Sequence, residues 1–155
     1  MSSLVALPTL IFPTFAARIE TVDGTLKIYD AIRKKYVALT PEEWVRQHCI
    51  HWLISRGYPI GRCSIERTIT GSGMRYDVLW VDATLAPFLL IECKSPDVSV
   101  NSTTLRQSAW YNLTLRSPNV LLTNGKVAYC ATVQSDGTAI LADDVPPYPP
   151  NIVHL

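Results

Sequence analysis

The stretch Phe88–Ser95, "FLLIECKS", constrains the fold most, because it begins with four consecutive apolar residues and ends in charged ones. Apolar runs without polar alternation are typical of strands buried on both faces, at the centre of a sheet covered by helices. Residues i and i+2 of a strand face the same side, so Glu92 and Lys94 project together while Cys93 points the other way. The stretch therefore predicts a central strand that ends in a carboxylate and an ammonium group side by side.

A helix is predicted directly after Thr40, in "TPEEWVRQHCIHWLISRG". Thr40 is a suitable N-cap, Pro41 suits the first helical position, and Glu43 completes a capping box with Thr40. Apolar residues recur at helical spacing along one face, and Gly57 is a helix stop. A second helix is predicted within residues 101–117.

The remaining segments alternate between strand and turn patterns. Asp23-Gly24 between two strand-like runs predicts a hairpin, followed by a short extended piece near residues 36–39. Further strands are predicted at 62–70, 74–82, 88–95, 119–125 and 126–133. The resulting order is αβββαβ, with an added strand and an N-terminal β-hairpin. Because the strand after the second helix returns parallel by a crossover, an α/β fold with one mixed central sheet flanked by helices is expected.

The chain of 155 residues, 48% of them hydrophobic, suits one globular domain. It divides into an apolar arm and hairpin (1–39), a core (40–133) and a proline-rich tail (134–155). The apolar N-terminus lacks a preceding positive charge and is interrupted by Pro8 and Pro13, so it reads as a packed arm rather than a signal peptide. No uninterrupted apolar run of about 18 residues occurs, so no membrane span is expected.

Charge and cysteine content narrow the classes of function. The net charge of +1 indicates no overall field for nucleic acid, although residues 1–116 carry 13 basic and 10 acidic side chains. That excess points weakly to a phosphate-rich partner, and an uneven distribution of charge caused by the tail is the alternative. The four cysteines lack zinc-site spacing, which favours free thiols in a reducing cytoplasm.

Asp77 lies in "RYDVLWV", the predicted strand just before the one that carries Glu92. Adjacent strands lie about 4.8 Å apart, so Asp77 and Glu92 are placed to share one hard cation, with water completing its shell as Mg²⁺ prefers. The backbone carbonyl of Cys93 is a further oxygen ligand within reach. Lys94 would then stand beside the metal, to position or deprotonate a water or to stabilise charge on a phosphate. The alternative is that all three charges are ordinary strand-end residues.

Several motifs together resemble the PD-(D/E)XK nuclease superfamily. They are "RYDVLWV…FLLIECKSPD", "LRQSAWYNL" and "TPEEWVRQH", joined by "IYDAIRKKYVAL", "GYP" and "VLLTNG". More closely, the chain is similar to the N-terminal nuclease domain of type I restriction enzyme R (motor) subunits, over roughly residues 7–148. The proline of the family's Pro-Asp pair is replaced here by Tyr76, and proline varies at that position in the superfamily.

The resemblance implies a restriction-endonuclease-like core and a catalytic set. Asp77 and Glu92 would hold the metal, Lys94 would be the catalytic lysine, and Gln107 and Tyr111 match a Gln-x-x-x-Tyr motif on the second helix. Four-residue spacing puts Gln107 and Tyr111 on one helix face, able to meet a phosphate or orient Lys94. A solvated position for Gln107 and core packing for Tyr111 are the alternatives.

Two further assignments rest on geometry. Arg75 shares the face of Asp77 by strand parity, which suits contact with a DNA phosphate or simple exposure at a strand edge. The resemblance also implies another acid from the first helix, and Glu42 and Glu43 compete for that role. Glu43 is expected nearly opposite the apolar face and engaged in capping, so Glu42 is assigned to the active site.

The function that the resemblance implies is a Mg²⁺-dependent endonuclease, with Mn²⁺ able to substitute, acting in restriction, defence or DNA repair. DNA is the expected partner, and cutting both strands would need a homodimer or a larger assembly. No Gly-x-x-x-x-Gly-Lys-Ser/Thr loop occurs, so this polypeptide alone is not expected to use ATP. The competing hypothesis is a catalytically silent nuclease fold that binds nucleic acid or serves in an assembly.

Overall fold

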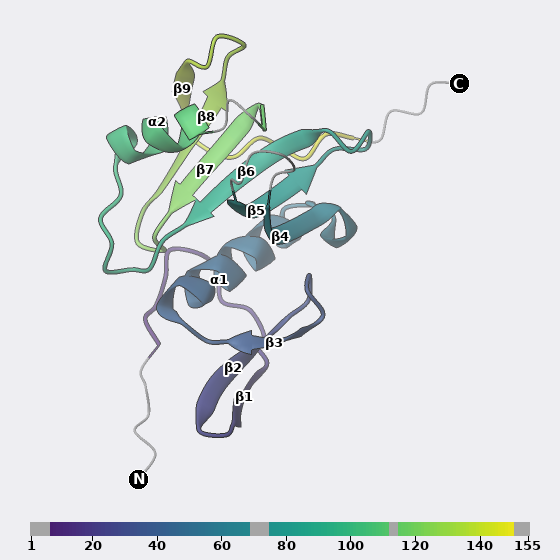
Figure 1. The fold of residues 1–155 in the computed structure, drawn as a ribbon, viewed down its shortest axis with the longest axis vertical. Coiled ribbons are helices and arrows are strands. Elements are labelled where there is room, and N and C mark those ends of the chain that lie inside the picture. Colours follow the sequence, from purple (N-terminus) through teal and green to yellow (C-terminus); the bar gives the residue numbers. More distant parts are fainter. Residues whose placement is uncertain (1–6, 69–74, 112–114, 151–155) are drawn as a thin grey trace.

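The computed structural model describes residues 7–68, 75–111 and 115–150. Within these residues the chain forms two β-sheets and two α-helices (Figure 1). A small antiparallel sheet has the order β1-β2-β3, and a larger sheet has the order β4-β5-β6-β7-β8-β9. The α/β class, the mixed sheet and the N-terminal hairpin agree with the sequence-based prediction.

The small sheet comprises β1 (Ile19–Val22), β2 (Thr25–Asp30) and β3 (Lys35–Ala38). Its first turn is the predicted one: Asp23 and Gly24 adopt φ values of 51° and 77°, and Val22 pairs with Thr25. Two consecutive positive φ values are what a two-residue hairpin turn requires, and Asp-Gly tolerates them well. The predicted extended piece near 36–39 is β3.

The six-stranded sheet contains β4 (Cys63–Thr68), β5 (Arg75–Val81), β6 (Pro87–Cys93), β7 (Asn119–Thr123), β8 (Ala128–Val133) and β9 (Ala139–Ala142). The strand pairs are antiparallel except β6 and β7, which run parallel. The predicted crossover through the second helix is therefore present. The predicted Gly-Ser-Gly turn between β4 and β5 lies outside the described residues.

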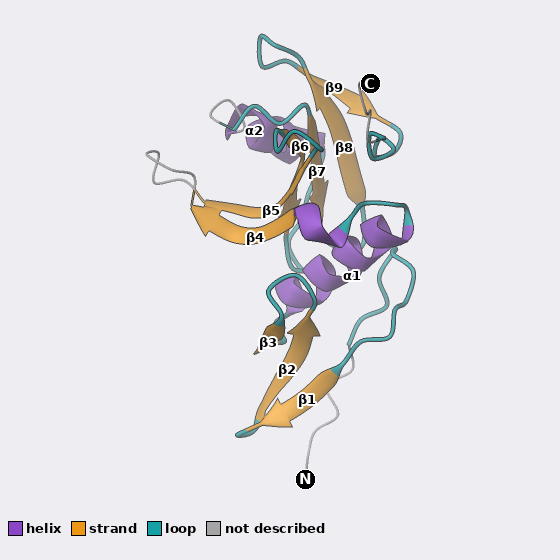
Figure 2. Ribbon diagram, turned by 90° about the vertical axis from the view of Figure 1, so that its right-hand side faces the viewer, coloured by secondary structure: helices purple, strands orange, loops and turns teal. Residues whose placement is uncertain are grey.

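Two helices cover opposite faces of this sheet (Figure 2). The helix α1 (Pro41–Ser55) packs on one face and α2 (Ser102–Tyr111) on the other. Strand β7 shows the alternation directly: Leu121 joins the core cluster of α1, whereas Val120 and Leu122 join the cluster of α2. In β6, Leu89 and Ile91 are buried in the cluster of α1, whereas Leu90 on the other face is only half-buried against the cluster of α2. The predicted burial of β6 on both faces is therefore partial, and β7 is the strand that is buried along its whole length.

The helix α1 is itself enclosed between the two sheets (Figures 1 and 2). Its start confirms the predicted N-cap, since the Thr40 hydroxyl accepts a hydrogen bond from the Glu43 backbone N–H at 3.0 Å and Pro41 opens the helix. The predicted capping box is not completed, because the Thr40 N–H donates to the Ala38 carbonyl and the Glu43 carboxylate is engaged by arginines instead. Eight of its side chains are buried: Glu43, Val45, Arg46, Gln47, His48, Cys49, Ile50 and Leu53. A helix covered on two sides buries more polar groups than its apolar stripe alone would suggest.

The two ends of the described chain both pack on the domain. Leu10 and Phe12 of the N-terminal arm belong to the core cluster of α1, as expected for an apolar arm. Within the predicted proline-rich tail (134–155), β9 extends the large sheet. This strand was missed in the sequence, since its four residues are half-buried or exposed and show no clear alternation.

Cys49, Cys63, Cys93 and Cys130 are all free thiols. Among the described residues, no helix has the length and apolar character needed to cross a bilayer.

Candidate active site

The candidate site lies where β5 begins and β6 ends. Val78 pairs with Ile91, and the same register places Asp77 opposite Glu92, one position further along. Both acids line a cavity of about 240 Å³, together with Glu66, Arg75 and Tyr76. The structure thus brings Asp77 and Glu92 together on neighbouring strands, which is the arrangement predicted from the sequence.

Glu92 is also a wall of a second cavity, of about 230 Å³, that contains Lys94 and Gln107. The Nζ atom of Lys94 lies 3.0 Å from Oε1 of Glu92, and this hydrogen bond raises the pKa of Lys94. Gln107 is exposed on α2 and faces this cavity. Tyr111 ends α2, and its side chain lies outside the described part of the structure.

Fixed donors hold both carboxylate oxygens of Asp77. Oδ2 accepts the backbone N–H of Cys93 at 2.8 Å, and Oδ1 accepts Nη2 of Arg46 at 3.1 Å. Burial raises the pKa of Asp77, and the nearby charges of Glu92 and Glu42 add to the rise, while the two donors oppose it. The Asp77 carboxylate is therefore fixed in direction at the edge of the cavity.

Arg46 connects three structural elements through one buried guanidinium. Its side chain is 3% exposed, and Nη1 lies 3.0 Å from Oε1 of Glu43 on the same helix. Its Nη2 lies 3.2 Å from Oε1 of Glu66 on β4 and 3.1 Å from Oδ1 of Asp77 on β5. Burial opposes the charge of Arg46, but the carboxylates around it more than offset this and raise its pKa.

The placement of Glu43 corrects the prediction that this residue faces away from the packed side of α1. Glu43 is 5% exposed, and its carboxylate accepts Nη2 of Arg33 at 2.5 Å as well as the Arg46 guanidinium. Arg33 comes from the turn between β2 and β3, where it also pairs with the fully buried Asp30. The prediction failed because the small sheet covers the side of α1 that was taken to be open to solvent.

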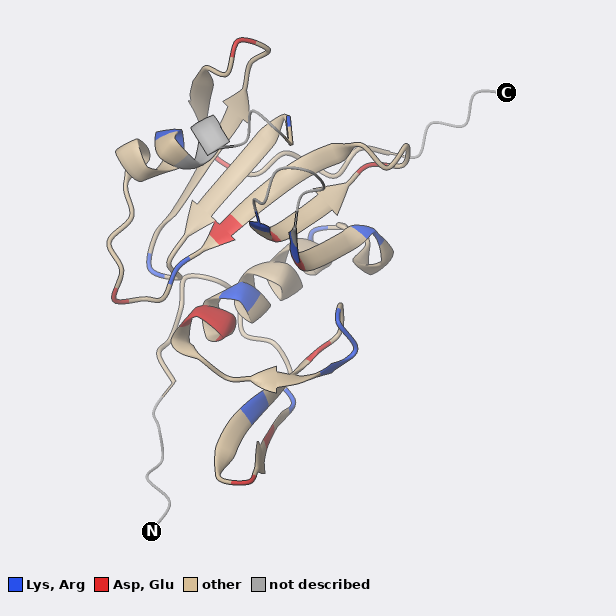
Figure 3. Cartoon of the chain, in the orientation of Figure 1, with Lys and Arg blue, Asp and Glu red and all other residues tan. Residues whose placement is uncertain are grey.

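Glu42 lies close enough to the candidate site for its charge to act on Asp77 and Lys94, and it remains a prediction as the helix acid of the site. Its charge raises the pKa of both Asp77 and Lys94, although it is not the largest influence on either. Unlike Glu43, it is only partly buried and is not part of the Arg33–Arg46 ion pairs. Figure 3 shows the acidic first turn of α1 and the acidic end of β6 in one view.

Glu66 is a site residue that the sequence analysis missed. It lies on β4 between the pairs Ile65–Val78 and Arg67–Tyr76, hence opposite Asp77. Its φ of 49° is unusual for a residue with a side chain, and such backbone conformations cluster at functional sites. The Glu66 carboxylate also holds Nη2 of Arg75 at 3.1 Å. No sequence motif marks it, because its partners come from distant parts of the chain.

Arg75 lies at the mouth of the Asp77 cavity. Its side chain is 62% exposed and is tethered to Glu66 rather than free. The exposure agrees with both readings made from strand parity, contact with a phosphate or simple exposure at an edge.

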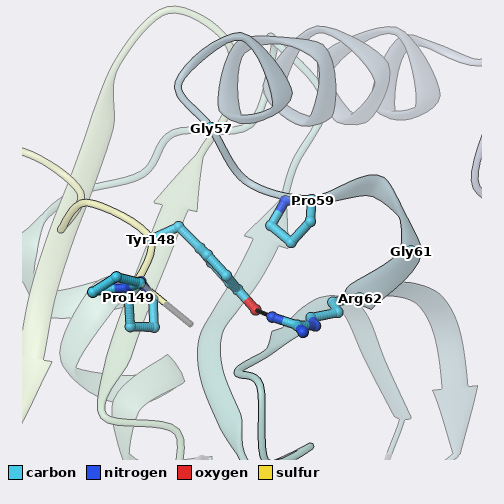
Figure 4. Close-up of a pocket in the computed structure, with 7 residues that line it drawn as sticks. Gly57, Pro59, Gly61, Arg62, Tyr148 and Pro149 are labelled. Carbon is cyan, nitrogen blue, oxygen red and sulfur yellow. Dashed lines mark hydrogen bonds between the residues drawn. The ribbon is translucent and has the colours of Figure 1, made fainter. Parts of the chain in front are cut away.

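A further cavity, of about 490 Å³, lies away from these acids (Figure 4). It is lined by Gly57, Pro59, Gly61, Arg62, Tyr148, Pro149 and Pro150. Arg62 points at Tyr148 and donates a hydrogen bond from Nη1 to the tyrosine hydroxyl at 3.0 Å. None of its lining residues is a carboxylate or an imidazole, so it lacks the ligands of a metal-dependent site.

The donor set at the Asp77 cavity suits a hard cation that keeps much of its water. In the described parts of the chain, no three His, Cys, Asp or Glu side chains are arranged so that all of them could hold one metal ion, although three acids line this cavity. Two carboxylates with water and a backbone oxygen are typical for Mg²⁺, whereas structural zinc needs four protein ligands. The residues present therefore fit Mg²⁺, and Asp77 and Glu92 are the side chains that would hold it.

The large sheet is mixed and carries the two acids on adjacent strands. One face is covered by a helix with an acidic first turn, and the other by a second helix. This arrangement is a restriction-endonuclease-like fold. Comparison with known families matches residues 41–146 to the type I restriction enzyme R protein N terminus. The chain belongs to this family. The comparisons with curated proteins and with solved structures give no significant match.

We predict that Arg46→Met lowers the free energy of unfolding by about 3–5 kcal/mol, because it leaves buried carboxylates without their cation. Urea denaturation followed by circular dichroism measures the change. The matched control is Arg56→Met near the end of α1, which removes an exposed ion pair with Asp144 and should cost about 0–1 kcal/mol. Equal losses in the two variants would show that the Arg46 pairs do not stabilise the fold.

Proposed function

We propose that this chain is a Mg²⁺-dependent endonuclease that hydrolyses phosphodiester bonds in DNA as part of a restriction or defence system. Membership of the type I restriction enzyme R protein N-terminus family supports the restriction-related role. The observation that carries the proposal is that Asp77 and Glu92, on adjacent strands, line one cavity. Lys94 lies beside them, with its Nζ atom 3.0 Å from Oε1 of Glu92. We further propose a cytoplasmic location and action within a dimer or larger assembly.

The proposed metal ligands are Asp77, Glu92 and the backbone carbonyl of Cys93, with Mn²⁺ as an alternative ion. Bound Mg²⁺ would supply a Lewis acid that polarises a phosphate oxygen and lowers the pKa of water. The proposed ligand from β5 is held by the Cys93 N–H and by Arg46, so the direction of its carboxylate is set before a cation binds.

Lys94 would stabilise charge on the phosphate and orient the attacking water. Its pKa is raised through its hydrogen bond with Glu92, which favours the protonated form and hence a donor rather than a base. Gln107 faces the same cavity and would hold a phosphate oxygen or the water beside Lys94. Arg75 at the neighbouring cavity mouth would contact a phosphate, and Tyr111 stays a candidate for the same task by its place on α2.

We predict that Asp77→Asn weakens Mn²⁺ binding by more than about tenfold, since even outer-shell partners of a metal contribute that much affinity. Titration calorimetry or the electron paramagnetic resonance signal of free Mn²⁺ measures the loss. Asp82→Asn is the matched control, because Asp82 lies beyond the other end of β5 in an exposed turn. Unchanged Mn²⁺ affinity in the Asp77 variant would exclude this metal site.

We predict that Lys94→Ala lowers the rate of Mg²⁺-dependent cleavage by roughly 100-fold or more, the usual loss when a donor to the developing charge is removed. Conversion of supercoiled plasmid to nicked or linear forms gives the rate, with EDTA as the metal-free control. Lys27→Ala on β2, far along the chain from the site motif, should cleave as the wild type does. Cleavage that survives the Lys94 substitution would overturn the mechanism, and a wild type that binds DNA without cutting it would favour a silent nuclease fold.

We predict that substitutions of Glu42 and Glu43, the two acids at the start of α1, affect different properties, cleavage in one case and stability in the other. Glu42→Gln should reduce Mg²⁺-dependent cleavage while changing the free energy of unfolding by no more than about 0.5 kcal/mol, as for other partly exposed positions. Glu43→Gln should instead destabilise the protein by about 3–5 kcal/mol, because an amide would face Arg33 and Arg46 in a buried site. Plasmid cleavage and urea denaturation on both variants test this. The assignment of Glu42 fails if its variant cleaves at the wild-type rate.

A further inference from the structure

A basic cavity of about 310 Å³ adjoins the acidic one, on the side of the small sheet. It is lined by Ile32, Arg33, Lys35, Cys63, Ser64, Ile65 and Arg67, so three of its seven lining residues are cationic and none is acidic. The lining comes from the β2–β3 turn and β3 on one side and from β4 on the other. Figure 3 shows the basic residues of that turn and of the start of β3.

The basic and acidic cavities share a border on β4. Glu66 lines the acidic cavity and its neighbour Arg67 lines the basic one. Arg67 pairs across the sheet with Tyr76, another wall of the acidic cavity. Arg33 lines the basic cavity and lies 3.4 Å from the Glu66 carboxylate. A ligand that spans the two cavities would therefore meet carboxylates at one end and cations at the other.

The cations available to a ligand are Lys35 and Arg67. Arg33 is already engaged by Asp30, Glu43 and Glu66, so these acids compensate its charge. Lys35 and Arg67 are exposed, and neither has a carboxylate partner within the described ranges 7–68, 75–111 and 115–150. Two unpaired cations at the mouth of a cavity with Ile32 and Ile65 in its wall suit an anionic ligand.

The turn that presents Lys35 is held in place before any ligand arrives. The Asp30 carboxylate accepts the backbone N–H of Ile32 at 2.7 Å and that of Arg33 at 3.1 Å. Lys35 pairs with Asp30 in the β2–β3 register, which puts it on the face of the small sheet that looks toward α1. A cation on a pre-ordered turn loses less entropy on binding than one on a free loop.

We propose that this cavity binds a backbone phosphate of the nucleic-acid strand whose neighbouring phosphodiester enters the Asp77 cavity. The inference rests on the proposed nuclease function and extends it, because it gives the strand a path from β5 across β4 to the small sheet. Strands β1 to β3 precede residue 41, where the family match begins, so the matched segment does not include them. With a net charge of only +1, affinity for a polyanion has to come from local cations such as these.

The test is nucleic-acid binding without cleavage, by fluorescence anisotropy of labelled duplex DNA, single-stranded DNA and RNA in EDTA. The double variant Lys35→Gln/Arg67→Gln should bind more weakly, and its slope of log K against log salt should become shallower by about one for each phosphate that these side chains neutralise. The control Lys27→Gln/Arg56→Gln removes the same charge. Lys27 pairs with Ala38 on the opposite face of the small sheet, and Arg56 follows α1.

The outcomes separate this inference from the nuclease proposal. Weaker binding and a smaller salt slope in the Lys35/Arg67 variant, but not in the Lys27/Arg56 control, support phosphate binding by the cavity. This holds whether or not the wild type cleaves DNA in Mg²⁺. If the two double variants bind nucleic acid equally well, the cavity does not bind a backbone phosphate, even if Lys94→Ala has abolished plasmid cleavage. A wild type that binds none of the three nucleic acids overturns the inference as well. The nucleic acid for which the Lys35/Arg67 variant loses the most affinity is the kind of strand that the cavity binds.

Discussion

The arrangement of the site depends on one buried guanidinium. Arg46 is held by Glu43 on its own helix and holds Glu66 of β4 and Asp77 of β5. A charge that is 3% exposed has lost most of its hydration, and only close pairing with carboxylates offsets that loss. Because the carboxylates come from three elements, helix and sheet must dock in one register for the pairing to exist. The same contacts that fix this docking also fix the direction of the Asp77 carboxylate.

Arg33 extends this constraint to the small sheet. It joins the buried Asp30 of β2 to Glu43 of α1, and it reaches Glu66 of β4 as well. The family match begins at residue 41, yet the ion pairs that organise the site include residues before it. The small sheet is therefore an integral part of the domain. Its Arg33 balances the charge of Glu43 and Glu66 next to the site, and the sheet covers the side of α1 that faces away from the large sheet.

The sequence predicted what local patterns determine and missed what distant contacts determine. The adjacency of Asp77 and Glu92 followed from two apolar runs joined by a short turn, and the start of α1 followed from Thr40 and Pro41. Glu66 carries no such local signal, since its partners lie on α1, on β5 and in the β2–β3 turn. Glu43 was misplaced for a related reason: helical periodicity finds one packed face and cannot show that a second sheet covers the other.

The two acids of the site differ in how firmly they are held, and this difference bears on function. Both oxygens of Asp77 have fixed donors, whereas Glu92 is 40% exposed and pairs with the long, 42% exposed side chain of Lys94. A rigid acid beside an adjustable one would suit the proposed function, in which the site admits a cation and a phosphate in turn. Buried ion pairs are often no more stabilising than apolar packing of the same volume, so the fold alone gives little reason to retain them here. Once formed, they are costly to break, and they also fix the direction of the Asp77 carboxylate, so they serve both the fold and the candidate site.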